Sequence, residues 1–100
     1  MKNKSVIIKK KIRNPYFSII TVVKNDQKNI KSTIKSIKAQ KFRKFEYIVI
    51  DGNSKDRTID QIIKLKNSVN LLITENDKGL YDAMNKGVKY SKGRVIVFVN

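Results

Sequence analysis

Four short apolar runs rich in β-branched residues alternate with segments of amphipathic spacing, and this alternation constrains the fold more than any other feature. The apolar runs occupy residues 17–23, 46–50, 69–74 and 94–99. Nearly continuous runs of this kind are typical of strands that are covered on both faces. Strands that alternate with helices predict right-handed crossovers and a mostly parallel α/β sheet with flanking helices.

Each segment between the apolar runs is expected to form a helix that buries one stripe of side chains. The three expected stripes are Ile30, Ile34 and Ile37; Ile59, Ile62 and Ile63; and Leu80, Ala83, Met84 and Val88. Asn25 and Asp26 offer caps for the first helix. Gly93 is expected to end the third helix in a left-handed conformation.

Composition limits the chemistry. The 100 residues suffice for one domain and include neither cysteine nor histidine. Disulfides and thiolate metal sites are therefore excluded, and the commonest general base is missing. Any acid–base chemistry must use the eight carboxylates, lysine or tyrosine.

The net charge of +15 raises the question of an anionic partner. Of the 23 basic residues, only four are arginine, the residue whose planar group reads bases bidentately. Nucleic-acid binding is therefore disfavoured. A solvated lysine-rich surface is the favoured interpretation, and peripheral contact with an anionic membrane is the alternative.

Residues 1–15 form a basic N-terminal arm, which is expected to be mobile, with an added edge strand as the alternative. Their only apolar run, residues 6–8, is far shorter than the core of a signal peptide or a membrane span. The chain is therefore expected to be cytoplasmic, with membrane-peripheral contact as an open alternative.

Polar residues gather where the predicted strands end, at residues 21–25, 51–54 and 75–77 and at Asn100. Ligands of open parallel sheets bind beyond the carboxyl ends of the strands. Neither G-x-G-x-x-G nor a Walker A motif is present, which disfavours dinucleotide and P-loop binding. The Asp51 carboxylate could accept the imide N–H of uracil or a ribose hydroxyl, and capping its own turn is an equal alternative.

Four blocks, at residues 18–25, 45–56, 77–87 and 92–100, resemble in order and spacing the amino-terminal half of family 2 glycosyltransferases. The resemblance implies a partial GT-A domain, a Rossmann-like fold truncated after the fourth strand, over residues 16–100. It also implies inverting transfer, of hexosyltransferase type, from a nucleoside diphosphate sugar, UDP-linked, to an acceptor hydroxyl in cell-surface polysaccharide or glycoconjugate synthesis. A non-catalytic nucleotide-binding module and a basic membrane-surface or nucleic-acid-binding protein remain the alternatives.

The resemblance also implies which residues bind the nucleotide. They are Thr21, Val22, Val23, Asp51, Gly52, Asp77, Lys78, Gly79 and Asn85. Many relatives carry a second aspartate where this chain has Gly52. The Asp-x-Asp motif for Mn²⁺ or Mg²⁺ is expected just after Asn100, and the catalytic base later still. No catalytic or metal-binding residue is therefore assigned within the chain, which alone is expected to be inactive.

Overall fold

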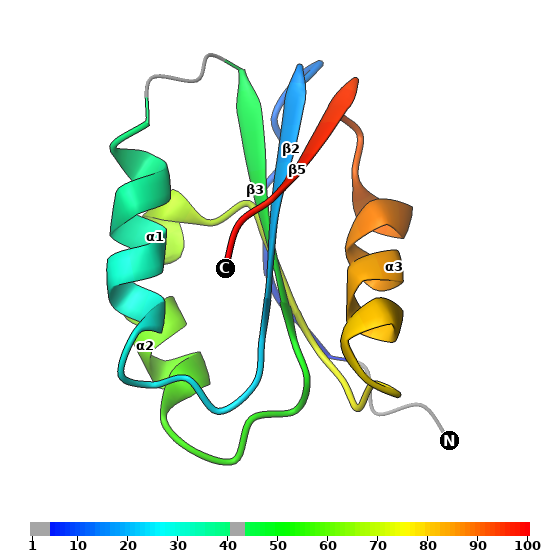
Figure 1. Ribbon diagram of the computed structural model, residues 1–100. Coiled ribbons are helices and arrows are strands. Elements are labelled where there is room, and N and C mark those ends of the chain that lie inside the picture. Colours follow the sequence, from blue (N-terminus) through cyan, green and yellow to red (C-terminus); the bar gives the residue numbers. More distant parts are fainter. Residues whose placement is uncertain (1–4, 41–43) are drawn as a thin grey trace.

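The computed structural model describes residues 5–40 and 44–100, which form a sheet with helices on both faces (Figure 1). The strands are β1 (Ser5–Lys9), β2 (Phe17–Val23), β3 (Phe45–Asp51), β4 (Leu71–Thr74) and β5 (Val95–Phe98). The helices are α1 (Ile30–Lys38), α2 (Thr58–Lys64), the short 3₁₀ helix η1 (Lys66–Ser68) and α3 (Leu80–Tyr90). Helices α1 and α2 cover one face, and α3 covers the other (Figure 1).

The five strands lie in the order β1-β4-β3-β2-β5. Strands β2 to β5 are parallel to one another, which confirms the α/β prediction, and β1 runs antiparallel to β4. Parallel neighbours bring the carboxyl ends of β2, β3 and β4 to one edge of the sheet. Any site formed by the loops after these strands therefore lies at that edge.

The expectation of a mobile arm is wrong for residues 5–9. Ser5 pairs with Thr74 and Lys9 with Leu71, so β1 belongs to the same sheet as the rest of the domain. Ile8 is 7% exposed and joins the core beneath the sheet, whereas its strand neighbours face solvent. The alternative, an added edge strand, is confirmed. The segment is held by its pairing with the edge of β4 and by the burial of Ile8.

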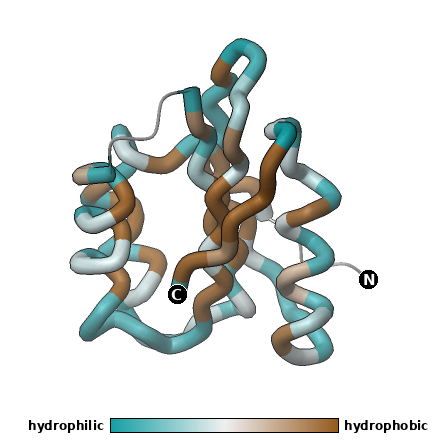
Figure 2. The backbone as a smooth tube through the Cα atoms, turned by 45° about the horizontal axis from the view of Figure 1, so that its top comes forward, coloured by the Kyte–Doolittle hydropathy of each residue, from teal (hydrophilic) through white to brown (hydrophobic). Residues whose placement is uncertain are grey.

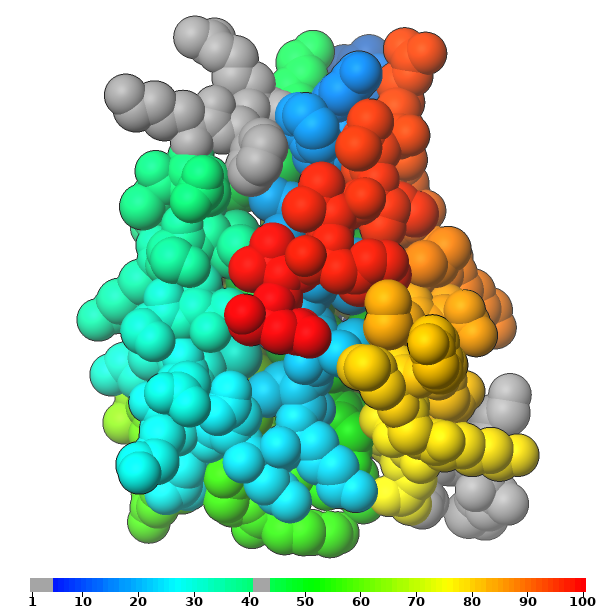
Figure 3. Space-filling model, in the orientation of Figure 1, coloured from blue at the N-terminus to red at the C-terminus, as the bar shows by residue number. Residues whose placement is uncertain are grey.

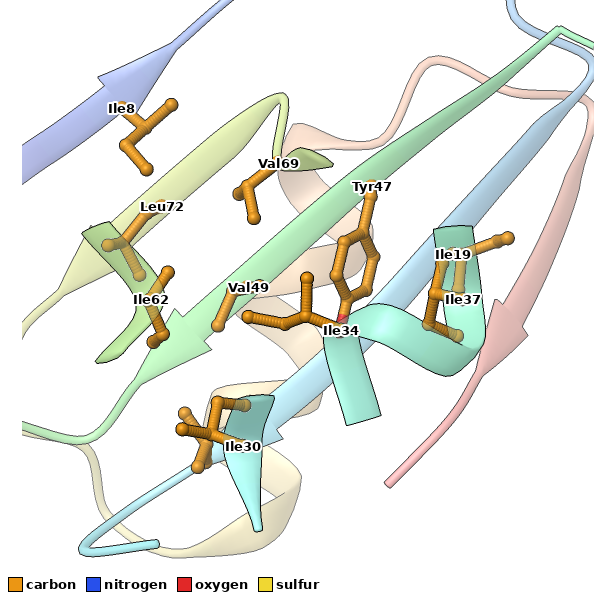
Figure 4. Packing of buried hydrophobic residues seen from close by; sticks show 11 residues of the cluster. Ile8, Ile19, Ile30, Ile34, Ile37, Tyr47, Val49, Ile62, Val69 and Leu72 are labelled. Atoms are coloured by element: carbon orange, nitrogen blue, oxygen red, sulfur yellow. The ribbon is translucent and has the colours of Figure 1, made fainter. Parts of the chain in front are cut away.

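Two apolar layers fill the space between sheet and helices. The larger layer lies under α1 and α2, where Tyr47 packs beside Ile34 and Ile19 beside Ile37 (Figure 4). The smaller layer, under α3, centres on Ile20. Figure 2 shows the hydropathy that produces this arrangement, with apolar residues along the strands and hydrophilic ones on the loops.

Helix α3 approaches the sheet through small residues. Ala83 and Gly87 are buried, and a Cβ at Gly87 would lie 2.6 Å from Cγ2 of Ile20. The expected inner stripe is wrong at Leu80 and Val88, which are 56% and 42% exposed. Helix α3 therefore contacts the sheet through its small residues, while the larger Leu80 and Val88 are exposed.

Other local predictions also fail. Ile63 of α2 is 41% exposed, so only part of its expected stripe is buried. Gly93 has no left-handed φ; instead, a Cβ there would lie 2.6 Å from the backbone nitrogen of Ser18. The glycine with a positive φ is Gly79, at 113°, which precedes α3.

Strand β5 was expected to be buried, but Val95, Ile96 and Phe98 are each between 37% and 39% exposed. The strand pairs with β2 along one side and forms the end of the sheet. Across the described residues, no helix has the length and apolar character to cross a membrane.

Candidate functional site

A cavity of about 330 Å³ lies at the edge where β2, β3 and β4 end. In Figure 3 the cyan segment that follows β2 and the yellow start of α3 lie next to each other at this edge. The cavity is lined by Val22, Val23, Lys24, Asp77, Gly79, Leu80 and Ala83. Apolar walls with a few charged groups are typical of sites for small organic ligands.

The two charged groups of the cavity have complementary uses. The Asp77 carboxylate can accept hydrogen bonds from N–H or O–H donors, and the Lys24 ammonium can attract an anion. Four of the residues predicted from the sequence line the cavity: Val22, Val23, Asp77 and Gly79.

Sequence reasoning missed three lining residues, Lys24, Leu80 and Ala83. Lys24 could have been found from its position, because it follows β2 directly at the ligand-binding edge of the sheet. Lys78 and Asn85 were predicted as site residues, yet both are exposed and neither lines the cavity.

Asp51 is fully buried at the tip of β3, and the chain itself uses both of its carboxylate oxygens. Oδ1 accepts a 2.5 Å hydrogen bond from the Ser54 hydroxyl, and Oδ2 accepts one of 2.9 Å from the Ser54 backbone N–H. The Thr74 hydroxyl donates a third, of 2.7 Å, to Oδ2. This geometry supports the turn-capping interpretation, and a contact between Asp51 and a base stays a prediction.

Thr21 is likewise buried and does not line the cavity. Its hydroxyl donates a 2.6 Å hydrogen bond to the backbone oxygen of Val99 and accepts one of 2.7 Å from the Tyr47 hydroxyl. Burial raises the pKa of Tyr47 to about 12, and the hydrogen bond to Thr21 opposes this shift. Thr21 therefore joins β2 to the segment after β5.

A hydrogen bond within the loop between β4 and α3 stabilises the turn that carries Asp77. Oδ1 of Asp77 accepts a 3.1 Å bond from the backbone N–H of Gly79. The next residue, Lys78, donates its backbone N–H to Oδ2 of Asp82 at 2.8 Å. That bond, opposed by desolvation and aided by the charge of Lys86, holds the pKa of Asp82 below its ordinary value. Carboxylates thus bind the backbone N–H groups of Lys78 and Gly79, the two residues that precede α3.

Lys86 and Asn53 hold the other side of this loop. The Lys86 ammonium donates a 2.8 Å hydrogen bond to the backbone oxygen of Asn76 and lies 3.5 Å from Glu75 Oε1. The Asn53 side chain donates a 2.9 Å hydrogen bond to Asn76 Oδ1. The loop after β4 is therefore tied both to α3 and to the turn after β3.

Gly52, also predicted as a site residue, does not line the cavity but lies against Asp77 and Lys24, which do. It is buried, and its N–H donates a 2.9 Å hydrogen bond to the backbone oxygen of Val23. A Cβ at this position would lie 2.6 Å from Oδ2 of Asp77. The structure thus brings the turn after β3 against the carboxylate that lines the cavity.

A second interlock joins the loops after β2 and β3. The Asp56 carboxylate accepts hydrogen bonds from the Thr58 hydroxyl and backbone N–H, and the backbone N–H of Asp26 donates to the Thr58 hydroxyl at 2.7 Å. The hydrogen bond from the Thr58 side chain is the main cause that lowers the pKa of Asp56. These contacts join the loops after β2 and β3, and Asp26 and Asp56 themselves line a different cavity.

Comparison with solved structures shows the same fold elsewhere. Staphylococcus aureus TarS, residues 1–349, matches 83% of this chain with a TM-score of 0.72 and 30% identity, over 26% of its own length. A TarS structure in complex with UDP matches with a TM-score of 0.70 and 29% identity. A mannosyltransferase from Pyrobaculum calidifontis, in complex with GDP-Man and Mn²⁺, matches 84% of this chain and 26% of its own with a TM-score of 0.74 at 21% identity, which bears on the fold alone. The fold is GT-A.

Curated sequences point the same way. An uncharacterized glycosyltransferase of Mycobacterium tuberculosis is 36% identical over 87 residues, which are 86% of this chain and 33% of that protein. Glycosyltransferase AglE of Haloferax volcanii is 29% identical over 91 residues, 86% of this chain and 30% of that protein. The chain thus spans about a third of the length of these relatives. Because the model of glycosyl transferase family 2 also matches residues 18–100, the chain belongs to this family.

Proposed function

We propose that the cavity beyond β2, β3 and β4 holds the nucleotide of a UDP-linked sugar donor. The observation that carries the proposal is the cavity itself, in which apolar walls meet the Asp77 carboxylate and the Lys24 ammonium at the ligand-binding edge of the sheet. The UDP complex of TarS, a protein with the same fold and 29% identity, supports a uridine nucleotide.

The proposed reaction is inverting transfer of a hexosyl group to an acceptor hydroxyl. The acceptor oxygen forms a bond to the anomeric carbon while the bond from that carbon to the diphosphate breaks on the opposite side. A carboxylate base takes the hydroxyl proton. The described residues would contribute by holding the nucleotide, so that the sugar presents one face to the acceptor.

We place the base and the metal-binding Asp-x-Asp motif outside these residues, as the resemblance to the family implies. Within residues 5–40 and 44–100, no three side chains of the kinds that bind metals gather into a group that could hold an ion. Mn²⁺ or Mg²⁺ bound elsewhere would neutralise the diphosphate as it leaves. We therefore expect residues 1–100 alone to bind nucleotide without transferring sugar.

The product is proposed to be a cell-surface polysaccharide or glycoconjugate. A glycosyltransferase of Mycobacterium bovis named for PGL/p-HBAD biosynthesis is 35% identical over 88 residues, 85% of this chain and 34% of that protein, which supports a biosynthetic role.

The donor can be tested first, by titrating the chain with UDP and with ADP in a calorimeter. We expect UDP to bind more tightly; equal affinities, or no heat with UDP, would refute the uridine assignment.

We further propose a cytoplasmic location with peripheral contact to an anionic membrane. A second cavity, of about 270 Å³, has Lys9, Lys11 and Lys92 among its lining residues, together with apolar side chains such as Val6. Lysines around an apolar patch can attract anionic lipid headgroups. Lys10 contributes less, because its ammonium donates hydrogen bonds to Lys66 and Asn67.

A further inference from the structure

The second cavity, of about 270 Å³, lies on the face of the sheet that α3 covers. Its walls include Leu71 of β4 and Tyr90, the last residue of α3. Glu46, the second residue of β3, also lines it. This cavity therefore lies toward the amino ends of β3 and β4, whereas the cavity lined by Asp77 lies beyond their carboxyl ends. A ligand bound here would be separate from the nucleotide.

Glu46 presents a carboxylate to this cavity, although its side chain is almost buried, at 7% exposed. Oε2 accepts 2.6 Å hydrogen bonds from the Ser18 hydroxyl and the Lys92 backbone N–H, whereas Oε1 accepts none from residues 5–40 and 44–100. Every side-chain nitrogen and oxygen that is fully buried in this part of the chain has a hydrogen-bond partner, so Oε1 is open to the cavity.

The Glu46 carboxylate also lacks a counter-charge. Within the described residues it forms no ion pair, and the ion pairs present there involve other carboxylates. A nearly buried charge without an opposite charge is costly to the folded state. A ligand with a cationic N–H donor would supply both the missing charge and the missing hydrogen bond at Oε1.

Three lysines add positive charge around the same cavity. Lys9, Lys11 and Lys92 line it and are exposed. Their ammonium groups form no ion pair with the part of the chain that the structure describes. Lysine ammonium groups bind phosphate as point charges. The lysines are therefore suited to hold an anion, in the cavity where Glu46 is suited to hold a cation.

The two kinds of charge together disfavour ligands of one sign. A simple cation would be attracted by Glu46 and repelled by the lysines, and a simple anion would meet the reverse. A ligand that carries an ammonium and an anion a few bonds apart would satisfy both. The volume of about 270 Å³ is near the lower limit of about 300 Å³ for ligand sites, which favours a small group.

We propose that this cavity binds a phosphoethanolamine group, a primary ammonium joined by two carbons to a phosphate. The ammonium donates to Oε1 of Glu46, and the phosphate lies among the three lysines. This group is the headgroup of an aminophospholipid, so the inference deepens the proposed membrane contact at this cavity and rests on it. Phosphocholine carries the same phosphate but has no N–H to donate, so the cavity should reject it.

The first experiment compares these two ligands. O-phosphoethanolamine and phosphocholine are titrated into the wild-type chain, which should bind the first about 10-fold or more tightly, the size of a hydrogen bond to a charged group. In Glu46→Gln the amide oxygen can keep both internal hydrogen bonds, but the charge is gone and the preference should disappear. Ser18→Ala disturbs the same buried network and leaves the carboxylate, so it should keep the preference. Circular dichroism verifies the fold of each variant.

The second experiment removes one charge at a time. Ethanolamine and inorganic phosphate should each bind about 10-fold or more weakly than O-phosphoethanolamine, because each satisfies only one half of the cavity. Changing both Lys11 and Lys92 to Gln should weaken the binding of O-phosphoethanolamine. The same change at Lys35 and Lys38 of α1 removes equal charge elsewhere and should leave it unaltered.

The third experiment distinguishes a lipid headgroup from a soluble ligand. All vesicles contain the same fraction of phosphatidylglycerol, and the remainder is phosphatidylethanolamine in one set and phosphatidylcholine in the other. Sedimentation should show that wild type and Ser18→Ala bind the ethanolamine vesicles more tightly, whereas Glu46→Gln binds both sets equally. A preference in solution without a preference between vesicles would support the cavity's chemistry and assign it to a soluble phosphoethanolamine compound.

The outcomes separate this inference from the proposed membrane contact. If anionic vesicles bind the chain but it does not distinguish ethanolamine from choline in either form, the inference is wrong while the contact through lysines stands. If Glu46→Gln keeps the preference, or Ser18→Ala loses it equally, the Glu46 carboxylate does not bind the ammonium and the inference is again refuted. If the chain binds neither vesicles nor O-phosphoethanolamine, both proposals fail.

Discussion

The Ser18 hydroxyl donates a 2.6 Å hydrogen bond to the buried carboxylate of Glu46 and thereby joins β2 to β3 inside the sheet. The same hydroxyl accepts a 2.7 Å hydrogen bond from the backbone N–H of Gly93, and the backbone N–H of Lys92 donates one of 2.6 Å to Glu46. The connection between α3 and β5 is thus fastened to the two central strands by one buried polar network.

We expect Ser18→Ala to lower the free energy of unfolding by about 1–3 kcal/mol, because it leaves the Gly93 N–H and the Glu46 carboxylate short of a partner. Urea denaturation measures the change. Ser36→Ala, which removes an exposed hydrogen bond on α1, should stay within about 0.5 kcal/mol of wild type. An equal effect of the two substitutions would show that the buried network adds no stability.

Asp51→Ala should destabilise the chain by about 2–4 kcal/mol, because three donors from Ser54 and Thr74 lose their acceptor. UDP affinity should also fall, by about 10-fold or more, since the turn that carries Gly52 lies against Asp77 and Lys24, which line the cavity. Calorimetry at a temperature where the variant remains folded separates the two effects. Unchanged stability together with lost affinity would instead favour a direct contact between Asp51 and the ligand.

Alkaline pH should destabilise the chain through Tyr47. Burial raises the pKa of its phenol to about 12 from the ordinary 10.0, so the folded state keeps a proton that the unfolded state releases. This contribution is complete below about pH 10 and is lost as the pH rises to about 12, in total about 2–3 kcal/mol. Unfolding of wild type and Tyr47→Phe across this range isolates it, because the lysines titrate in both. Parallel pH profiles for the two proteins would contradict the prediction.

Vesicles that contain anionic lipid should bind the chain at low salt and release it as salt rises. Changing both Lys9 and Lys11 to Glu should weaken binding more than the same change at Lys35 and Lys38 of α1, although the net charge is equal. A sedimentation assay compares the two double variants. An equal loss of vesicle binding in the two double variants would assign the binding to overall charge. Sequence-selective binding to duplex DNA at physiological salt, tighter than binding to vesicles, would favour a nucleic-acid partner.

The strands of the sheet could be predicted because their signal is local. The run at residues 17–23 coincides with β2, and the polar residues after the strands do gather at one edge. The run at residues 6–8 was too short to decide between arm and strand. The strand forms because it pairs with the edge of β4, which is distant from it in the sequence.

The site was less predictable, because its contacts join residues that are distant in sequence. A helical stripe suggests that Leu80 faces the core, but Ala83 and Gly87 are the buried residues of α3 and Leu80 lines the open cavity. Likewise, no sequence pattern shows that Asp77 fills the space above Gly52. Packing between elements decides both.

The pairing of β1 with β4 sets an order on folding. Strand β1 is synthesised before β2 to β5, yet its neighbour in the sheet is β4, whereas β2 and β3 can pair much sooner. Contacts that are distant in sequence form late, and the terminal edge of a sheet opens most easily. Among the strands, amide hydrogen exchange should therefore be fastest in β1 and slowest in β3. Until β1 pairs with β4, the exposed Lys9 at its end would disfavour pairing with the strands of other chains.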